Sequence, residues 1–225
     1  MNFACVCYGD KYPVEYVQKL YNMVKRNTTI DHNFIVFTDH VKMHKMVTGD
    51  IDIRKFPEED LSGWWNKLQL FHPDVDLPGD TLYTDLDVVI TENIDCFFTH
   101  KPEADFVGMN DFNPTTKQWN SSVMRFKSDK LNDKIWHKFM GDRPAFLRRF
   151  AGDQNLISDF IKETPGCESY PDSWTQSYKW YDRKGNRYSR QDMTFEHNGE
   201  SLVTVFHGQP NPHESDKMWI KKHWK

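Results

Sequence analysis

The sequence contains no long apolar run and no N-terminal segment with the charged and apolar regions of a secretory leader. A membrane-spanning helix needs about 20 mainly apolar residues, and a leader needs an apolar stretch of roughly 7–15 residues. We therefore expect a protein that is made and kept in the cytoplasm, with any membrane contact restricted to its periphery.

Cysteine is also scarce, since the 225 residues contain four, at positions 5, 7, 96 and 167. Cys5 and Cys7 are two residues apart in an apparent strand and therefore share a face, and their spacing differs from the CxxC pattern of zinc and redox sites. Free thiols in a reducing compartment are the expected state.

An excess of positive charge is missing, because 29 Lys and Arg face 33 Asp and Glu and give a formal net charge of −4. A general nucleic-acid-binding protein would normally be basic, so we expect no nucleic-acid partner. Aromatic residues, in contrast, are plentiful: 8 Trp, 9 Tyr and 16 Phe supply the large buried area of a folded core.

Strand and helix patterns alternate in the first half of the chain. Residues 3–8, 34–37 and 51–53 are predicted strands, and apolar residues at helical spacing over 14–24 predict a helix that begins near Pro13. This β-α-β order predicts an α/β fold with a parallel sheet and helices on both faces. In such sheets ligands bind beyond the carboxyl ends of the strands.

The second half of the chain has a more mixed pattern. Strands are predicted over 104–108, 120–126 and 202–206, helices over 61–71, 129–139 and 153–161, and a hairpin turn over 184–186. Asp153 is the expected N-cap of the last helix. Because the sequence contains no repeat and no linker, we predict a single domain.

Asp85 and Asp87 lie within an apolar, β-branched run over residues 80–90. Residues i and i+2 of a strand point to the same side, so the two carboxylates are expected to converge. Two anions near a core need a cation between them. The pattern indicates a divalent metal, and a metal at a strand end usually holds a phosphate as well. The alternative is a pair of surface carboxylates.

His207 follows the last predicted strand and precedes Gly208. A neutral imidazole suits Mn²⁺ as a third ligand and is less natural for Mg²⁺. We therefore interpret Asp85, Asp87 and His207 as one set of metal ligands. The alternative is a histidine that is satisfied within a turn.

Other polar and aromatic residues are candidates for substrate binding. Tyr8 ends the first predicted strand and Asp10 follows it, and the two are expected to contact a base and a ribose. Lys67 can hold a phosphate as a point charge, and its alternative is a solvated helix lysine. Trp64 and Trp65 can form a platform for a sugar or a base, and their alternative is core packing.

In combination these segments resemble the GT-A nucleotide-sugar glycosyltransferases. Asp85-Leu-Asp87 resembles their DxD motif, and residues 63–68 (GWWNKL) resemble the helix before DxD in bacterial and phage members related to family 8. Residues 120–124 (NSSVM), 152–155 (GDQN) and 206–212 (FHGQPNP) are similar to the family's NSGVM-like, GDQ/DQD and HGxPKP segments. The matches keep the family's order and span nearly the whole chain.

The resemblance implies a GT-A fold, Mn²⁺ or alternatively Mg²⁺, and transfer of a sugar from a UDP-sugar donor to a hydroxyl of a glycan, glycolipid or other acceptor. The metal ligands that it implies are Asp85, Asp87 and His207. The implied nucleotide or diphosphate contacts are Tyr8, Lys67 and Gly208. The residues that it places around the donor sugar are Asn120, Asp153 and Gln154. The nucleotide half is expected at about residues 1–95, the acceptor half at 96–206, and the terminal motif and tail at 207–225.

The resemblance favours a reaction that retains the configuration of the anomeric carbon. Asp153 and Gln154 would then stabilise the face of an oxocarbenium-like transition state. An inverting reaction would instead need a carboxylate base, for which Asp153 is the candidate. One residue departs from the family pattern: Asn211 stands where HGxPKP has Lys. The departure removes a positive charge beside the leaving group, and Lys179 or a stronger reliance on the metal would offset it.

Two other functions stay open on the sequence alone. A sugar nucleotidyltransferase also uses paired carboxylates and a metal, but it would want a Gly-rich phosphate loop, which residues 7–10 lack. A non-catalytic nucleotide- or carbohydrate-binding protein on the same fold is the second alternative, and Asn211 keeps it open. The basic, aromatic tail over 217–225 can contact an anionic membrane surface, and its alternative is a frayed terminus or a strap packed on the sheet.

Overall fold

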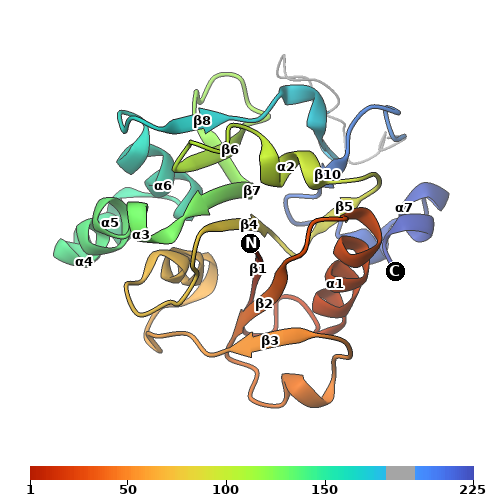
Figure 1. Cartoon of the computed structure of the whole chain (residues 1–225), viewed down its shortest axis with the longest axis horizontal. Helices are drawn as coiled ribbons and strands as arrows, with labels where there is room; N and C mark the ends of the chain where they lie inside the picture. Colours follow the sequence, from red (N-terminus) through yellow and green to blue (C-terminus); the bar gives the residue numbers. More distant parts are fainter. Residues whose placement is uncertain (181–195) are drawn as a thin grey trace.

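The computed structural model describes residues 1–180 and 196–225, so the turn predicted over 184–186 lies outside the described residues. A seven-stranded sheet has the order β3-β2-β1-β4-β7-β6-β8, and a three-stranded sheet has the order β5-β10-β9 (Figure 1). The strands are β1 (Asn2–Cys7), β2 (Asn33–Thr38), β3 (Ile51–Arg54), β4 (Asp80–Thr84), β5 (Val88–Ile90), β6 (Phe106–Asn110), β7 (Trp119–Lys127), β8 (Cys167–Ser169), β9 (Thr175–Ser177) and β10 (Val203–Val205).

Strands β1 to β4 are parallel to one another, as the β-α-β pattern predicts. Strand β7 runs antiparallel to both of its neighbours, β4 and β6, so the large sheet is mixed. The strand order changes direction at β1, which has β2 on one side and β4 on the other. In an open α/β sheet a ligand crevice forms beyond the carboxyl ends of the strands at such a point.

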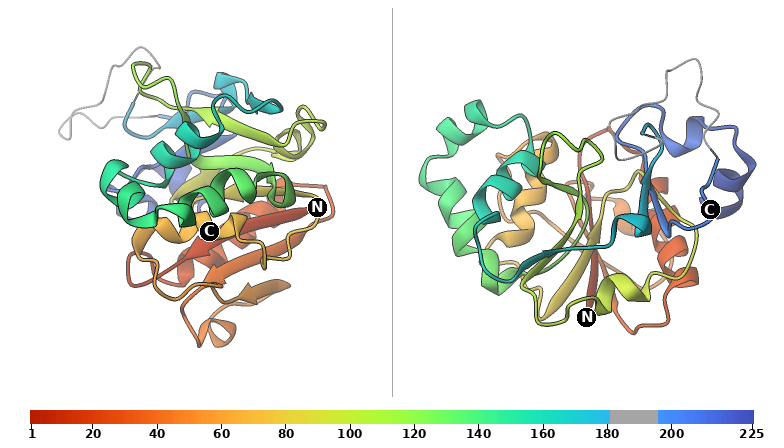
Figure 2. Two further views of the ribbon diagram at one scale, coloured as in Figure 1. Left: turned by 90° about the vertical axis from the view of Figure 1, so that its left-hand side faces the viewer. Right: turned by 90° about the horizontal axis from the view of Figure 1, so that it is seen from above.

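Helices cover both faces of the large sheet, with α1 and α7 on one side and α3 to α6 on the other (Figures 1 and 2). The helical segments are α1 (Glu15–Asn27), η1 (Met43–Lys45), η2 (Gly63–Phe71), α2 (Asp95–Thr99), α3 (Ser128–Leu131), η3 (Asp133–His137), α4 (Lys138–Gly141), α5 (Arg143–Arg149), α6 (Asp153–Ile161), η4 (Asp172–Trp174), η5 (Pro212–Glu214) and α7 (Met218–His223). Within the described residues, no helix has the length and apolar character that a membrane crossing requires.

The continuous apolar sequence of β1 reflects burial on both faces. Phe3 and Cys5 belong to the core cluster beneath α1, whereas Ala4 and Val6 belong to the cluster that includes η2 and α6. Side chains alternate across a strand, so a strand covered on both sides needs apolar residues at every position. Among the described residues all four cysteines are free thiols, as predicted.

Two local predictions differ from the structure. The helix predicted over 129–139 is broken into α3, the π-helical η3 and α4, because the Asn132 side chain accepts a hydrogen bond from the Asp133 backbone N and its carbonyl bonds the N–H of His137. The assignment of Asp153 as an N-cap is wrong. Gly152 occupies that position, and Asp153 is the first helical residue, with its carboxylate bonded to side chains of other elements.

The C-terminal tail packs against the body of the protein as a strap. Ile220 and Trp224 are buried in the core on the α1 side of the sheet. The Arg26 guanidinium of α1 donates hydrogen bonds of 2.7 Å to the carbonyls of His223 and Lys225. The basic residues of α7 therefore belong to a packed segment and lie next to the basic last turn of α1.

Candidate active site

A cavity of about 300 Å³ lies beyond the carboxyl ends of β1 and β4. It is smaller than two other cavities, of about 460 and 720 Å³, but it gathers nearly all of the predicted site residues. Its lining includes Tyr8, Lys67, Asp85, Asp87, Asn120, Asp153, Gln154, His207 and Gly208. Asp10 is the exception, because it is exposed in the loop after β1 and does not line the cavity.

Asp85 and Asp87 do not lie within a strand, so the alternation argument that paired them is wrong. Strand β4 ends at Thr84 and β5 begins at Val88, and the aspartates occupy the connection between the two sheets. Two backbone hydrogen bonds fix this connection. The Asp85 N–H bonds the Ser122 carbonyl at 2.9 Å, and the Asp87 carbonyl accepts from the N–H of Phe206 at 3.1 Å.

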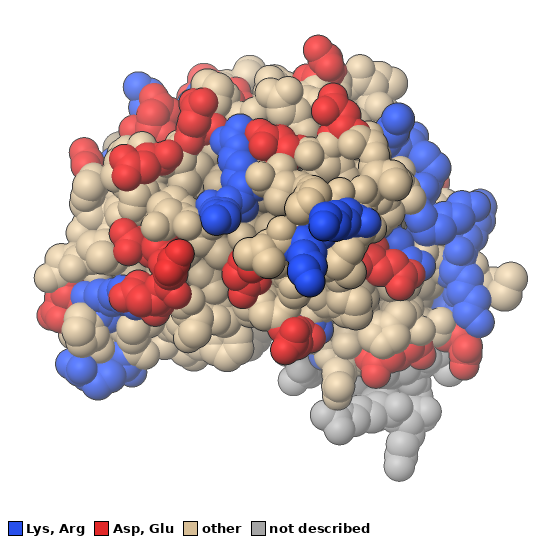
Figure 3. Space-filling model, turned by 90° about the horizontal axis from the view of Figure 1, so that it is seen from below, with Lys and Arg blue, Asp and Glu red and all other residues tan. Residues whose placement is uncertain are grey.

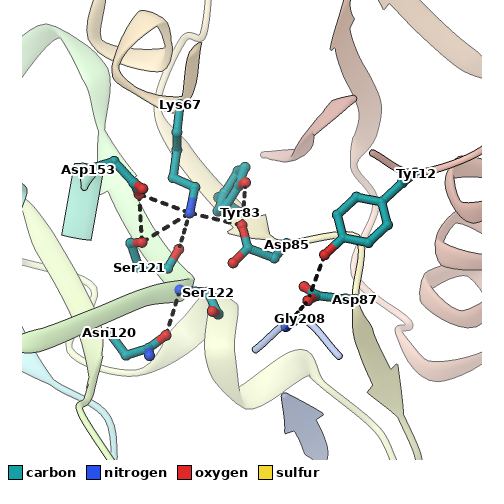
Figure 4. Close-up of polar contacts among 10 residues, drawn as sticks. All are labelled: Tyr12, Lys67, Tyr83, Asp85, Asp87, Asn120, Ser121, Ser122, Asp153 and Gly208. Atoms are coloured by element: carbon teal, nitrogen blue, oxygen red, sulfur yellow. Dashed lines mark hydrogen bonds and ion pairs between the residues drawn. The ribbon is translucent and has the colours of Figure 1, made fainter. Parts of the chain in front are cut away.

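Lys67 lies between Asp85 and Asp153, which come from distant parts of the chain (Figure 4). Its Nζ is 2.9 Å from Asp85 Oδ1, 3.0 Å from Asp153 Oδ2 and 3.0 Å from Ser121 Oγ. An ammonium has three N–H groups, so this arrangement satisfies all of them. The Lys67 side chain is only 8% exposed, which rules out the solvated lysine.

The charges of this cluster stabilise one another. Burial lowers the pKa of Lys67, but Asp153 and Asp85 outweigh it and raise the pKa above the usual value for lysine. Burial raises the pKa of Asp85, and Lys67 together with hydrogen bonds from Tyr83 and Ser122 brings it below the usual value. The Tyr83 hydroxyl donates to Asp85 Oδ1 at 2.7 Å, and the Ser121 hydroxyl donates to Asp153 Oδ2 at 2.7 Å. Lys67 and Asp85 therefore form an ion pair, and the Lys67 ammonium lies between two carboxyl groups.

Asp87 is held by two neutral donors and is 5% exposed. The Tyr12 hydroxyl donates to Asp87 Oδ2 at 2.8 Å, and the Gly208 N–H donates to the same oxygen at 3.0 Å (Figure 4). Both bonds fall on Oδ2 and so orient the carboxylate. The sequence interpretation missed Tyr12, although a polar aromatic residue in the loop after the first strand is the kind of signal that marks a ligand crevice.

His207 follows β10 in a left-handed conformation, with φ of +54°, and Gly208 continues it with φ of +78°. Burial lowers the pKa of His207 to about 4, with Asp87 opposing and Lys179 assisting the shift. The imidazole is therefore neutral at pH 7. Its Nε2 is buried and has no hydrogen-bond partner among residues 1–180 and 196–225.

The donor chemistry of Asp85, Asp87 and His207 fits a divalent cation such as Mn²⁺. The carboxyl oxygens of two aspartates and a neutral imidazole with an unpaired Nε2 are suitable oxygen and nitrogen ligands. In the part of the chain that the structure describes, however, no three His, Cys, Asp or Glu side chains form a ready-made metal cluster. The three-ligand set remains a prediction.

The predicted sugar-side residues are held in place by amide hydrogen bonds. Asn120, which is 4% exposed, accepts from the Ser122 N–H at 2.9 Å through Oδ1. Gln154 donates from Nε2 to Asp111 Oδ2 at 2.6 Å. Asn211, the departure from HGxPKP, is the N-cap residue of η5, and its N–H donates to Glu214 Oε2 at 2.6 Å.

The two adjacent tryptophans have different surroundings. Trp65 is stacked with Phe139 of α4, with ring centroids 6.2 Å apart, and is half-buried against the core. Trp64 is 50% exposed, lines the cavity and stands against Gly152. Only Trp64 therefore retains the predicted role of a platform.

The fold is that of the GT-A glycosyltransferases: a mixed sheet flanked by helices, in a single domain. Solved structures with this fold include LgtC, at 13% identity and a TM-score of 0.68, with 99% of this chain and 93% of LgtC covered. The glycosyltransferase GlyE of Streptococcus pneumoniae TIGR4 matches at 12% identity and a TM-score of 0.69, with 94% of this chain and 56% of GlyE covered. Mouse xyloside xylosyltransferase 1 matches at 10% identity and a TM-score of 0.58, with 93% of this chain and 98% of the mouse chain covered.

The chain thus spans nearly the whole of LgtC and about half of GlyE. No protein-family model matches the sequence, and no curated protein matches it. Sequence identities of 10 to 13% show a shared fold and no more, so any activity has to be argued from the residues of the site.

Proposed function

We propose that this protein transfers a sugar from a nucleotide sugar, expected to be a UDP-sugar, to a hydroxyl of an acceptor. The observation that carries the proposal is that Asp85, Asp87 and His207 line one cavity, at the point where the strand order of a GT-A sheet changes direction. One solved structure of LgtC contains donor and acceptor sugar analogs, and that enzyme shares the fold at 13% identity. This relationship supports a similar pair of substrates here.

The principal chemical need of the reaction is to stabilise the departing diphosphate. A divalent metal held by Asp85, Asp87 and His207 would supply Lewis-acid stabilisation of that charge. Tyr12 and Gly208 orient Asp87 by bonding Oδ2, which leaves Oδ1 for a ligand. Lys179 donates to the His207 carbonyl at 2.7 Å and so brings a cation beside the segment in which Asn211 replaces lysine.

Asp153 fits a stabilising role better than that of a base. Its Oδ2 already accepts from the Lys67 ammonium and the Ser121 hydroxyl. A carboxyl group fixed by an ammonium and a hydroxyl is positioned to stabilise a nearby positive charge, whereas an inverting transfer needs a base that reaches the acceptor hydroxyl. We therefore propose a retaining reaction in which Asp153 and Gln154 face the reacting carbon of the donor sugar.

A screen of UDP-sugars with Mn²⁺ tests this function and separates it from its rivals. The transferase is expected to release UDP slowly from at least one donor even without acceptor, and to lose this activity when EDTA removes the metal. A sugar nucleotidyltransferase would instead release pyrophosphate from a nucleoside triphosphate and a sugar phosphate. Binding of UDP without turnover of any donor would identify a binding protein and refute the proposal.

Replacing Tyr12 with phenylalanine is expected to weaken metal binding while preserving the fold. The change removes one of the two bonds that orient Asp87, and partners of metal ligands typically contribute about 10–100-fold to affinity. The Mn²⁺ concentration that gives half-maximal UDP release should rise about tenfold. The matched control is Tyr21→Phe, which removes a phenol that accepts from the Asp50 N–H far from the cavity. An unchanged Mn²⁺ requirement in Tyr12→Phe would contradict the assignment.

We also propose that the basic surface formed by α7 and the last turn of α1 contacts anionic membranes, which would suit a lipid-linked acceptor. Figure 3 shows Lys and Arg side chains gathered on its right-hand side, where α1 and α7 lie. Lys221 and Lys222 are both exposed on α7. Reversing both charges (Lys221→Glu with Lys222→Glu) should abolish flotation with phosphatidylserine vesicles, since each basic residue near such a surface contributes about 1 kcal/mol.

The matched control for flotation reverses Lys42 and Lys45, which are exposed around η1 in the connection between β2 and β3. This control should float with the vesicles as the wild type does. Equal flotation of the wild type and the α7 variant would refute the membrane contact and leave the strap as a purely structural element.

A further inference from the structure

The two aspartates of the candidate active site differ in the charge of their partners. Asp85 Oδ1 accepts from the Lys67 ammonium at 2.9 Å and from the Tyr83 hydroxyl at 2.7 Å. The Asp87 carboxyl group, in contrast, accepts from a neutral hydroxyl and a neutral backbone N–H, both on Oδ2. One of the two proposed metal ligands is therefore already paired with a cation that belongs to the protein itself.

Several contacts hold Lys67 in this position (Figure 4). Besides Asp85, its Nζ contacts Asp153 Oδ2 and Ser121 Oγ, each at 3.0 Å, and it lies 5.2 Å from the centroid of the Tyr83 ring. The three N–H groups of the ammonium are thus all used within the protein. If Lys67 is to contact a diphosphate, as the sequence predicts, it has to give up at least one of these contacts.

The Lys67 ammonium opposes a divalent metal at Asp85. Two cations on one carboxylate repel each other, and the repulsion is stronger in a buried site than in water because the effective dielectric constant is lower. A diphosphate changes this balance, because its anionic oxygens offer the ammonium an alternative partner. Lys67 lines the same cavity as both aspartates, and its flexible four-carbon stem allows the ammonium to move a short distance.

We propose that Lys67 is an exchangeable counter-ion, which pairs with Asp85 in the free protein and moves to the diphosphate when a nucleotide binds. The exchange frees Asp85 for the metal, so metal and nucleotide bind tightly only together. This inference rests on the proposed function and deepens it, because it assigns to one side chain the coupling between the two ligands. It predicts weak binding of Mn²⁺ to the protein on its own.

The test measures the affinity for Mn²⁺ without nucleotide, from the electron paramagnetic resonance signal of free Mn²⁺. Lys67→Gln should bind Mn²⁺ about tenfold more tightly than the wild type, since the competing charge beside Asp85 is gone. Addition of UDP should tighten Mn²⁺ binding less in this variant than in the wild type. The two ligands affect each other's affinity by the same factor, so calorimetry of UDP with and without Mn²⁺ should show the same reduced gain.

A double variant, Lys67→Gln with Asp153→Asn, separates competition at Asp85 from a change of net charge. The two changes leave the formal net charge of the protein unaltered, and the second one removes the carboxyl group that the first leaves without its cation. Circular dichroism establishes that each variant is folded. The double variant should also bind Mn²⁺ more tightly than the wild type, and it keeps the test decisive if Lys67→Gln alone fails to fold.

The matched control is Lys11→Gln, which removes the same charge from the same cavity. Lys11 is exposed, and its ammonium lies over the Tyr12 ring, 4.7 Å from the centroid. Because the charge of an exposed lysine is screened, the affinity of this control for Mn²⁺ should stay within about twofold of the wild type. An equal gain in Lys11→Gln, or an unchanged or weaker affinity for Mn²⁺ in the double variant, would overturn the inference.

The outcome is distinguishable from that of the UDP-release screen. Tighter Mn²⁺ binding in the Lys67 variants, without UDP release from any donor by the wild type, would refute the transferase and leave the counter-ion in place. Metal-dependent UDP release by the wild type, with unchanged Mn²⁺ affinity in those variants, would refute the counter-ion and leave the transferase in place.

Discussion

Replacing Asp87 with asparagine is expected to reduce metal-dependent UDP release at least 100-fold without destabilising the protein. The amide keeps the shape of the carboxylate and can still accept from Tyr12 and Gly208, but it loses the charge that a metal needs. Loss of one electrostatic group aimed at a developing anion typically costs about 10²–10³ in rate. Because a buried carboxylate bonded only by neutral donors is costly, the melting temperature should stay the same or rise.

The matched control for Asp87 is Asp95→Asn, at a carboxylate that bonds the Thr28 hydroxyl and the Thr29 backbone and lies outside the cavity. Burial raises and these bonds lower the pKa of Asp95, with a net shift below its usual value. Asp95→Asn should therefore lower the melting temperature and leave UDP release unchanged. Full metal-dependent activity in Asp87→Asn would show that the metal site proposed here is wrong.

Replacing Lys67 with methionine is expected to have the largest effect on stability, a loss of about 3–5 kcal/mol at pH 7. Methionine has a similar length but leaves Asp85 and Asp153 buried without their shared cation. Removing one partner of a buried ion pair is far more costly than removing a surface pair, which contributes about 0–1 kcal/mol. Urea unfolding of the wild type and the variant measures the difference.

The pH dependence of this loss follows from the pKa shifts. In the wild type the pKa of Asp85 is below its usual value, so its ionised form contributes stability above about pH 4 that is lost as the pH falls through the folded pKa. Without Lys67, burial raises the pKa of the same carboxyl, and protonation relieves the unpaired charge. The deficit of Lys67→Met should therefore shrink as the pH falls from 7 to 5, and a second change, Asp153→Asn, should recover part of it. A deficit that is below 1 kcal/mol, or that is the same at both pH values, would contradict the ionised cluster.

The parallel half of the fold follows from local sequence patterns. Residues 3–8 and 34–37 are apolar enough to be recognised as strands buried on both faces, residues 51–53 form the half-exposed edge strand β3, and the helical spacing after Pro13 locates α1. The gathering of the candidate site could be predicted for the same reason. The carboxyl ends of β1 and β4 meet at one edge, which brings Tyr8 and Asp85 together.

What the sequence could not provide are contacts between distant segments. The apolar run over 80–90 conceals the point where the chain leaves one sheet for the other, because both β4 and β5 are buried and neither Gly nor Pro marks the break at Asp85–Asp87. Asp153 has the side chain of an N-cap, but its pairing with Lys67, 86 positions earlier in the numbering, outweighs that local preference. The Tyr12 bond to Asp87 likewise depends on the folded sheet.

The most direct test of the central claim, a metal-dependent nucleotide-sugar site built on Asp87, is a calorimetric titration of UDP in the presence of Mn²⁺ and of EDTA. The account predicts that Mn²⁺ tightens UDP binding at least tenfold in the wild type, since the metal joins the diphosphate to the carboxylates, and that Asp87→Asn removes this gain. UDP binding that is equally strong with Mn²⁺ and with EDTA, or a full Mn²⁺ effect in Asp87→Asn, would contradict it.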